Sequence, residues 1–374
     1  MGGGLPSGDA PYNRTALVDV LLHIVRHYNE GWGGDVAGAG AARYFEVWNE
    51  PDSALNDGRF WNRSAAEFYD LVDETTRAIK AYDGALRVGA PGVANALSPA
   101  DNPYSFGLIS ELGTRGTPID FFSWHCYSDN SSLYVDMATR VRAALDAAFP
   151  TRTIASHVTE FFPYVLYYKQ DAAEGAAAFA TTLLELVRSG VSLAVAYPLC
   201  SSGENRTNGT GWGLFDEESQ PGEALWRRLT HGLAMFGVLA QEAPALLPTD
   251  YTSPREDGVA VLAGKSSGAV LARSSEAGSS EAGSSAATLL RVLVSSQASQ
   301  QSSVAVALRG LVPNSTWQFT VEVVDDPGGV APTERAGGVA AASVDGRLNV
   351  TFALPPPAVA LVRLRCLLCA AEAR

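Results

Sequence analysis

Clustered positive charge is missing from this sequence of 374 residues. It has 27 Lys and Arg against 40 Asp and Glu, a formal net charge of −13, and no long run of basic residues. Nucleic acids and anionic membrane surfaces are bound mainly through clustered cations, so neither is expected as the main partner. A neutral or weakly charged substrate is easier for such a chain to accommodate.

Long apolar segments are missing as well. No stretch reaches the roughly 18 apolar residues that cross a bilayer, and the opening MGGGLPSGDAPYN lacks the basic and apolar regions of a signal peptide. The hydrophobic fraction of 47% is still enough to build a sizeable core. We therefore expect a globular chain without a membrane span and with room for two domains.

Cysteine is scarce, with only four residues: Cys126, Cys200, Cys366 and Cys369. This number is too small for a disulfide scaffold. Cys366 and Cys369 form a single CxxC pair, whereas a zinc site of this kind needs a second pair of ligands. We expect structural cysteines and no metal or organic cofactor.

N-glycosylation sequons, in contrast, are frequent. Seven of the twelve asparagines begin an N-x-[ST] motif: Asn13, Asn62, Asn130, Asn205, Asn208, Asn314 and Asn349. Such motifs accept glycans along the secretory route. The pattern predicts a secreted or lysosomal/vacuolar glycoprotein, which conflicts with the missing signal peptide.

Helical and extended patterns alternate up to about residue 240. Apolar residues at helical spacing precede or follow each apolar run, and Ser64 and Glu67 form a capping box at the start of one helix. Five strand-then-helix units predict a parallel sheet with helices outside, either a barrel or an open sheet. The expected strands are 44–48, 87–93, 119–127, 154–162 and 192–199.

From about residue 245 the sequence becomes β-rich, with turns and almost no helical periodicity. This pattern predicts an all-β sandwich of about seven strands. We expect domains at 1–240 and 245–374, with the duplicated polar tract 274–285 as a hairpin loop. The expected strands are 258–265, 269–273, 288–295, 303–311, 316–324, 348–354 and 358–364.

Polar groups follow four of the five parallel strands where each strand ends. They are Asn49 and Glu50, His125 and Tyr127, Glu160, and Tyr197. Because working residues of parallel α/β folds gather at the carboxyl ends of strands, these side chains are expected to share one rim. Two carboxylates that face each other across a barrel mouth are the minimal equipment for cleaving a glycosidic bond.

Each of these residues also has a structural interpretation. Asn-Glu-Pro alone is a turn or helix-entry signal, and Glu160 alone could be an exposed strand end. His125 and Tyr127 taken singly are better explained as core polar residues. Their joint placement at strand ends, in this order, favours the catalytic interpretation.

Several segments together resemble glycoside hydrolase family 39, which contains β-xylosidases and α-L-iduronidases. They are FEVWNEPD at 45–52, the HxY of His125 and Tyr127, VTEFF at 158–162, and GWGLFDEESQPGEALW at 211–226. The later segments SVAVALRGLVPNSTWQFTVEVVDD and LPPPAVALVRLRC look like the β-sandwich of iduronidase-like members. The resemblance implies a (β/α)8 TIM-barrel glycosidase domain followed by an all-β sandwich.

The resemblance also implies roles for individual residues. It assigns the acid/base to Glu50, the nucleophile to Glu160 and a contact with the sugar 2-hydroxyl to Asn49. His125 and Tyr127 match a pair that contacts sugar and orients the nucleophile. Such enzymes retain anomeric configuration, which requires carboxyl groups about 5 to 5.5 Å apart.

This sequence departs from the family pattern in two ways. The NEP strand is the fourth of the barrel in the family, so we expect strands 4 to 8 of an N-terminally truncated barrel and suspect a truncated gene model. In addition, iduronidase-like enzymes place a basic residue after the sixth strand, where this chain has Tyr127 followed by Asp129. A carboxylate there would repel a uronic acid, although Arg206 could supply positive charge.

The sequence therefore favours a retaining hydrolase of a terminal, neutral sugar, most similar to a β-xylosidase, with a glycoside or oligosaccharide as substrate. Two alternatives remain open. One is a non-catalytic or degenerate carbohydrate-binding relative, and the other is an α-L-iduronidase-like hydrolase of uronides. The oligomeric state is not indicated.

Overall fold

The computed structural model divides into two compact units, each of which is described by itself. Unit 1 comprises Met1–Phe162 and Leu186–Tyr197, and unit 2 comprises Pro163–Glu185 and Pro198–Arg374. The structure describes residues 13–31, 42–53, 60–94, 103–163, 172–198, 214–217, 224–226, 228–249, 259–266, 288–297, 303–325 and 331–369. No helix within these ranges is both long enough and apolar enough to span a membrane.

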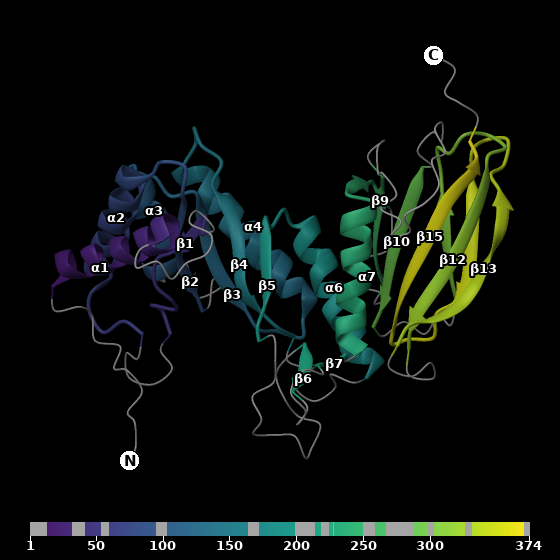
Figure 1. The fold of residues 1–374 in the computed structure, drawn as a ribbon, viewed down its shortest axis with the longest axis horizontal. Coiled ribbons are helices and arrows are strands. Elements are labelled where there is room, and N and C mark those ends of the chain that lie inside the picture. The colour runs from purple at the N-terminus through teal and green to yellow at the C-terminus, as the bar shows by residue number, and fades with distance from the viewer. Residues whose placement is uncertain are drawn as a thin grey trace. The chain divides into compact units, whose positions relative to one another are not determined.

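A parallel sheet forms the centre of unit 1 (Figure 1). Its five strands lie side by side in the order of the chain, and every neighbouring pair is parallel. This is the arrangement of five consecutive strands of a (β/α)8 barrel, as predicted. The strands are β1 (Tyr44–Glu46), β2 (Arg87–Val93), β3 (Phe121–Cys126), β4 (Ala155–Phe161) and β5 (Leu193–Ala196).

Helices connect these strands, and their boundaries follow local capping chemistry. Ser64 and Glu67 form the predicted capping box, and Asn130 caps another helix by accepting a hydrogen bond from the Ser132 amide. Asn13 does the same for the first helix. The helices are α1 (Arg14–Arg26) with the π-turn η1 (His27–Gly31), α2 (Ala65–Tyr82), η3 (Pro103–Gly107), α3 (Leu108–Thr114) and α4 (Ser131–Ala148).

The two faces of the sheet differ in their environment. All six residues of β3 are buried, as expected for a central parallel strand. At the edges formed by β1 and β5 among the described residues, Tyr44 is 62% exposed and Leu193 is 42% exposed. Tyr44 lies against Phe121 and His157, so these three side chains share one face of the sheet. Side chains alternate along a strand, so Trp124 points to the opposite face. On that opposite face, Phe161 packs against Tyr134 of α4. We call the face that carries Tyr44, Phe121 and His157 the concave face.

The described residues of unit 2 form two helices, which two antiparallel sheets follow. The helices are α6 (Ala173–Arg188), which continues into unit 1 at its last turn, and α7 (Arg228–Glu242). A short hairpin of β6 (Phe215–Glu217) and β7 (Ala224–Trp226) precedes α7, where a helix from about residue 221 was expected. That expectation was wrong for residues 224–226, which pair as a strand.

The larger antiparallel sheet has the strand order β13-β12-β15-β10-β9-β8, and β11 pairs with β14 separately. These strands are β8 (Ala245–Leu247), β9 (Val259–Lys265), β10 (Leu289–Ser296), β11 (Ser303–Leu308), β12 (Thr316–Val324), β13 (Thr333–Ala341), β14 (Leu348–Ala353) and β15 (Ala358–Leu368). The expected strand at 269–273 and the polar tract 274–285 lie outside the described residues. The strands β8 and β13 were not predicted from the sequence.

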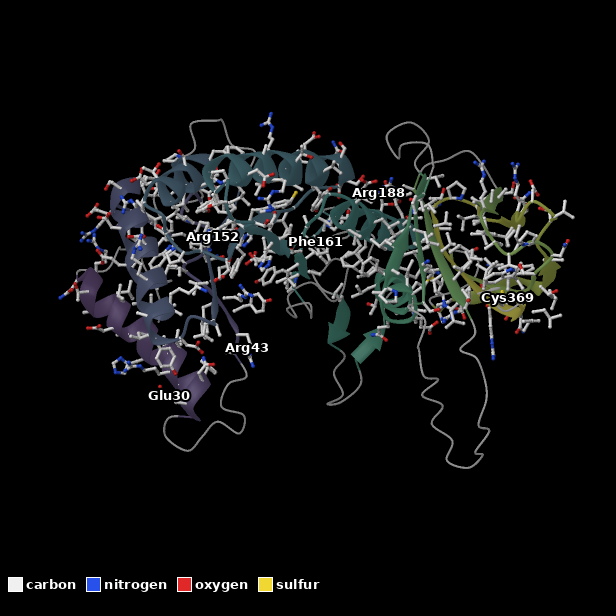
Figure 2. The ribbon with its side chains drawn as sticks, turned by 90° about the horizontal axis from the view of Figure 1, so that it is seen from above. Glu30, Arg43, Arg152, Phe161, Arg188 and Cys369 are labelled. Atoms are coloured by element: carbon white, nitrogen blue, oxygen red, sulfur yellow. A yellow bond between two sulfur atoms is a disulfide. The ribbon has the colours of Figure 1, made fainter. Side chains whose placement is uncertain are left out.

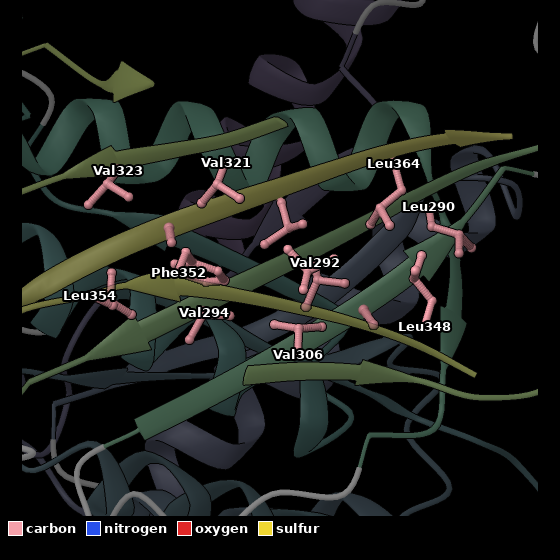
Figure 3. Packing of buried hydrophobic residues seen from close by; sticks show 14 of the residues in the cluster. Leu290, Val292, Val294, Val306, Val321, Val323, Leu348, Phe352, Leu354 and Leu364 are labelled. Carbon is pink, nitrogen blue, oxygen red and sulfur yellow. The ribbon is translucent and has the colours of Figure 1, made fainter. Parts of the chain in front are cut away.

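One apolar core joins the two sheets (Figure 3). Val292 and Val294 of β10 and Leu364 of β15 pack in the same cluster as Val306 of β11 and Phe352 of β14. Inward residues of both sheets therefore share one buried layer, in line with the predicted all-β sandwich.

The CxxC pair lies at the end of β15, and its two cysteines, Cys366 and Cys369, form a disulfide (Figure 2). Their expected structural role is thus realised as a covalent cross-link. Cys126, the other cysteine among the described residues, is buried and free. The predicted domain boundary between residues 240 and 245 stays a prediction. The two compact units divide the chain at other positions, and α7 and most of α6 belong to unit 2.

Candidate active site

Glu50 is held at the end of β1 by an unusual backbone. Trp48 has φ 76° and Glu50 has φ 47°, both in the left-handed region that non-glycine residues seldom adopt. The Glu50 amide donates hydrogen bonds to the carbonyls of Pro91 and Gly92, at 3.2 and 3.0 Å. Such backbone costs about 1 kcal/mol or more for each residue and persists where the surrounding structure enforces it, which is common at functional sites.

The carboxyl groups of Glu50 and Glu160 meet at the ring of His125. His125 Nδ1 lies 2.8 Å from Glu50 Oε1 and 3.5 Å from Glu160 Oε2. One ligand atom from each of the three side chains lies within 4.8 Å of the others. The predicted pair of carboxylates, Glu50 and Glu160, lies 110 positions apart in the sequence and is brought together in one site.

The burial of this cluster increases inward. The His125 side chain is 1% exposed, whereas Glu50 and Glu160 are 17% and 25% exposed. The histidine therefore forms the floor, and both carboxylates remain reachable from solvent. Ions in such a partly buried setting interact more strongly than at a protein surface.

Tyr127 fixes one oxygen of Glu160. Its hydroxyl donates to Glu160 Oε2 at 2.5 Å. Burial, together with the neighbouring Glu160 carboxylate, raises the pKa of Tyr127 far above its ordinary value. The phenol therefore keeps its proton and acts as a permanent donor to Glu160.

A β-bulge aims Glu160 at this site. Trp124 of β3 pairs with Val158 of β4, but the next residue, His125, pairs with Glu160, so Thr159 is an extra residue in β4. The pairing of β4 with β5 also has one extra residue in β4, between Val158 and Phe161. Bulges of this kind re-aim side chains next to active sites. Without the bulge, the two-residue period of a strand would turn Glu160 to the opposite face.

Asn49 lies beside the same cluster, next to a glycine. Gly92 has φ +59°, and a Cβ atom built on it would approach His125 Nε2 to 2.8 Å, Glu46 Oε1 to 2.9 Å and Asn49 Oδ1 to 3.2 Å. Three polar side chains therefore converge on the space that a larger residue would fill. Asn49 itself is exposed and open to a ligand.

Tyr197 follows β5 and is 50% exposed. Its amide donates to the Phe161 carbonyl at 3.2 Å, which continues the strand pairing. Tyr197 also lies close enough to contribute to the raised pKa of Tyr127. It therefore borders the cluster, without a direct hydrogen bond to either carboxylate among the described contacts. Arg206 lies outside the described residues.

One carboxylate of the site, Glu46 of β1, was not predicted from the sequence. Thr159 Oγ1 donates to Glu46 Oε1 at 3.0 Å, and Ser123 also hydrogen-bonds this carboxyl group. Glu46 is exposed as a whole residue, but protein atoms surround its carboxyl group. This burial raises the pKa of Glu46, and the two hydrogen bonds, which lower the pKa, offset the effect only in part. The signal in the sequence was its two-residue spacing from Tyr44, which places both residues on the concave face.

The same side chains could hold a metal ion. Glu50, His125 and Glu160 form the group of acidic and histidine ligands that lies close enough for this purpose within the described part of the chain. Chelation would occupy both carboxylates, whereas glycoside cleavage needs one of them protonated and the other free to attack. The chemistry that suits this geometry without a further group is acid/base and nucleophilic catalysis at an acetal.

Comparison with protein families places this site in a known context. Residues 11–177, which include Asn49, Glu50, His125, Tyr127 and Glu160, match the family described as "Glycosyl hydrolases family 39". This segment belongs to glycoside hydrolase family 39. The family that the motifs resembled is thereby confirmed.

A curated relative of this family 39 segment is a β-xylosidase from Geobacillus stearothermophilus. The two sequences are 28% identical over 114 residues, which are 30% of this chain and 20% of that enzyme. The match therefore covers only a minor part of the relative.

Solved structures of glycosidases share the fold over nearly the whole chain. A glucosidase from Croceicoccus marinus matches with a TM-score of 0.69 at 19% identity, and the match covers 96% of this chain and 75% of the glucosidase chain. A monomeric β-xylosidase from Caulobacter crescentus has a TM-score of 0.65 at 16% identity, with coverages of 97% and 76%. At such identities these likenesses show the fold, and they support a partial barrel followed by antiparallel sheets.

Proposed function

We propose that this glycoside hydrolase family 39 protein is a retaining exo-glycosidase that releases a terminal, neutral sugar, with β-xylosides as its preferred substrates. The observation that carries the proposal is the separation of the Glu50 and Glu160 carboxyl oxygens, which is within 4.8 Å. Retaining glycosidases place their carboxyl groups about 5 to 5.5 Å apart, whereas inverting enzymes leave about 6.5 to 9.5 Å for a water molecule.

In the first step, a Glu160 oxygen attacks the anomeric carbon and forms a glycosyl ester. The bond from this carbon to the leaving oxygen breaks, and Glu50 transfers its proton to that oxygen. Tyr127 donates to Glu160 Oε2, so this hydrogen bond orients the carboxylate and leaves the other oxygen for attack.

In the second step, the ionised Glu50 removes a proton from water, and the water oxygen attacks the anomeric carbon. The bond to Glu160 breaks, the sugar leaves with its original configuration, and Glu50 is protonated again. His125 contacts both carboxyl groups. We assign it the role of keeping them apart and oriented while the proton moves from Glu50 to the leaving group and back.

Sugar binding is assigned to the exposed rim. Asn49 lies beside Gly92 and His125, where its amide can hydrogen-bond the 2-hydroxyl group of a sugar, a contact that strengthens in the transition state. Tyr197 offers an aromatic face with 50% exposure. The exposed Asp129 follows Tyr127 and disfavours a substrate with a carboxylate, which supports a neutral sugar over a uronide.

The test compares substrates with good and poor leaving groups on two variants. In Glu50→Ala, kcat/KM for a dinitrophenyl β-xyloside should stay close to that of the wild type, whereas kcat/KM for a poor leaving group should fall by about 10²- to 10⁴-fold. Glu160→Ala should lose both activities. Glu111→Ala, a carboxylate on α3 away from the site, serves as the control and should retain both.

Azide provides a second readout. It should rescue Glu50→Ala and give a glycosyl azide of retained configuration, because azide needs no general base. The acid/base assignment is wrong if Glu50→Ala slows good and poor leaving groups equally. A faster reaction on a uronide than on the matching xyloside would overturn the choice of a neutral sugar, and sugar binding without any turnover would support the non-catalytic alternative.

A further inference from the structure

Glu46 connects two strands that are not neighbours in the sheet. It lies on β1, and Thr159 lies on β4, with β2 and β3 between them. The Thr159 hydroxyl nevertheless donates to Glu46 Oε1 at 3.0 Å. The Glu46 side chain therefore reaches across the concave face and links the strand that precedes Glu50 to the strand that carries Glu160.

Small residues on the intervening strands make this reach feasible. Gly92 of β2 leaves the space where a Cβ atom would lie 2.9 Å from Glu46 Oε1. Ser123 of β3 accepts a hydrogen bond from the Gly92 amide at 3.0 Å and also hydrogen-bonds Glu46. The carboxyl group of Glu46 is thus fixed by partners on β3 and β4.

The residue that Glu46 contacts on β4 is the bulge residue itself. His157 and Thr159 both face the concave side, and Phe161 faces the other side, where it packs against Tyr134 of α4. Glu160 can share the concave face with Thr159 only because the bulge adds one residue. Any relaxation of this bulge would turn Glu160 away from Tyr127.

We propose that Glu46 is a positioning residue, which anchors the Thr159 bulge by its hydrogen bond and thereby aims Glu160 at the anomeric carbon. This inference rests on the proposed function for its kinetic consequence, but not for its structural one. Glu46 itself touches neither the substrate nor the leaving group in this account. Its effect is transmitted through Thr159 to the orientation of Glu160.

The kinetic test measures the effect of Glu46 on the nucleophile Glu160 separately from any effect on the acid Glu50. A dinitrophenyl 2-deoxy-2-fluoro-β-xyloside needs no protonation of its leaving group, so its rate of covalent labelling reports the position of Glu160. Thr159→Val removes the donor and Glu46→Leu removes the acceptor, and each should slow labelling about tenfold or more. The double variant should be no slower than the slower single variant, because both changes break the same hydrogen bond.

Two further variants serve as controls. Glu46→Gln keeps an oxygen acceptor of the same reach and should label within about threefold of the wild type. Thr117→Val makes the same chemical change as Thr159→Val, since the Thr117 hydroxyl donates to Asp73 Oδ1 at 2.5 Å, but it lies before β3 at the opposite end of the sheet. It should leave the labelling rate unchanged even where it lowers the melting temperature.

The proposal is overturned if Thr159→Val and Glu46→Leu label as fast as Thr117→Val. It is also overturned if Glu46→Gln is as slow as Glu46→Leu, because the charge and not the hydrogen bond would then matter. If the wild type is not labelled at all, the proposed function fails instead. Crystal structures of the wild type and Thr159→Val then decide: loss of the Tyr127–Glu160 contact in the variant supports the positioning role, and an unchanged contact refutes it.

Discussion

His157 is expected to make unit 1 lose stability in acid. It lies on β4 with 4% exposure and stacks on Phe121, with ring centroids 4.3 Å apart and planes 18° apart. Burial lowers the pKa of His157 from 6.5 to about 4. The imidazole is therefore neutral in the folded protein at a pH where it is already protonated in the unfolded chain.

The sign and size of the effect follow from this difference. Between pH 6.5 and about 4 the unfolded state binds more protons than the folded state, so the free energy of unfolding falls as the pH falls. The loss approaches about 3 kcal/mol near pH 4 and then levels off. His157→Phe keeps an aromatic ring on Phe121 but cannot take up a proton, so this part of the pH dependence should vanish.

The assay must follow unit 1 by itself. Urea titrations at several pH values between 4 and 7, read by hydrogen exchange of peptides from β3 and β4, give its free energy of unfolding. The difference between wild type and His157→Phe should change by about 3 kcal/mol across this range. Parallel curves for the wild type and His157→Phe would refute the reasoning.

Two further variants test the site. Tyr127→Phe removes the donor to Glu160 and should lower kcat/KM about 10- to 100-fold, since hydrogen bonds to charged groups contribute about 1.5 to 3 kcal/mol; a change below about twofold would contradict its orienting role. Gly92→Ala places a Cβ atom 2.8 Å from His125 Nε2 and should lower kcat/KM more than about tenfold. Gly116→Ala, with a similar positive φ but open space around it, should cost stability alone; equal kinetics for both alanine variants would show that crowding at the site is unimportant.

Much of unit 1 was predictable from the sequence because local signals and burial agree there. The strand at Arg87–Val93 was predicted with the observed bounds, and the Ser64 capping box fixes the start of α2. The order of the strands in the chain, and the rule that functional groups follow parallel strands, were enough to predict that Glu50 and Glu160 lie close together. These features depend on periodicity and capping, which a single sequence displays.

Other features depend on tertiary contacts that no local pattern encodes. Threonine is common in β-strands, so the residue type of Thr159 does not indicate a bulge. Only the pairing of β4 with β3 and β5 reveals it. Glu46 looked like a polar residue within a strand until its contact with Thr159 was seen. The strand β13, TERAGGVAA, has two glycines and two charges, and pairing with β12 overrides this low propensity.

Some expectations stay predictions. A secretory location and N-glycosylation rest on the sequons. Within the described residues all five sequon asparagines are exposed and could carry a glycan: Asn13, Asn62, Asn130, Asn314 and Asn349. At Asn13 and Asn130 the helix cap uses the side-chain oxygen, which remains an acceptor after a glycan is attached to the nitrogen.

The central claim is that Glu160 is the nucleophile of a double displacement, and covalent trapping tests it most directly. The wild-type protein would be incubated with a dinitrophenyl 2-deoxy-2-fluoro-β-xyloside, digested and analysed by tandem mass spectrometry. We expect one fluoroxylosyl ester, on Glu160, and no ester in the Glu160→Ala variant. Labelling of Glu50, or hydrolysis of a β-xyloside with inversion and no trapped ester, would contradict it.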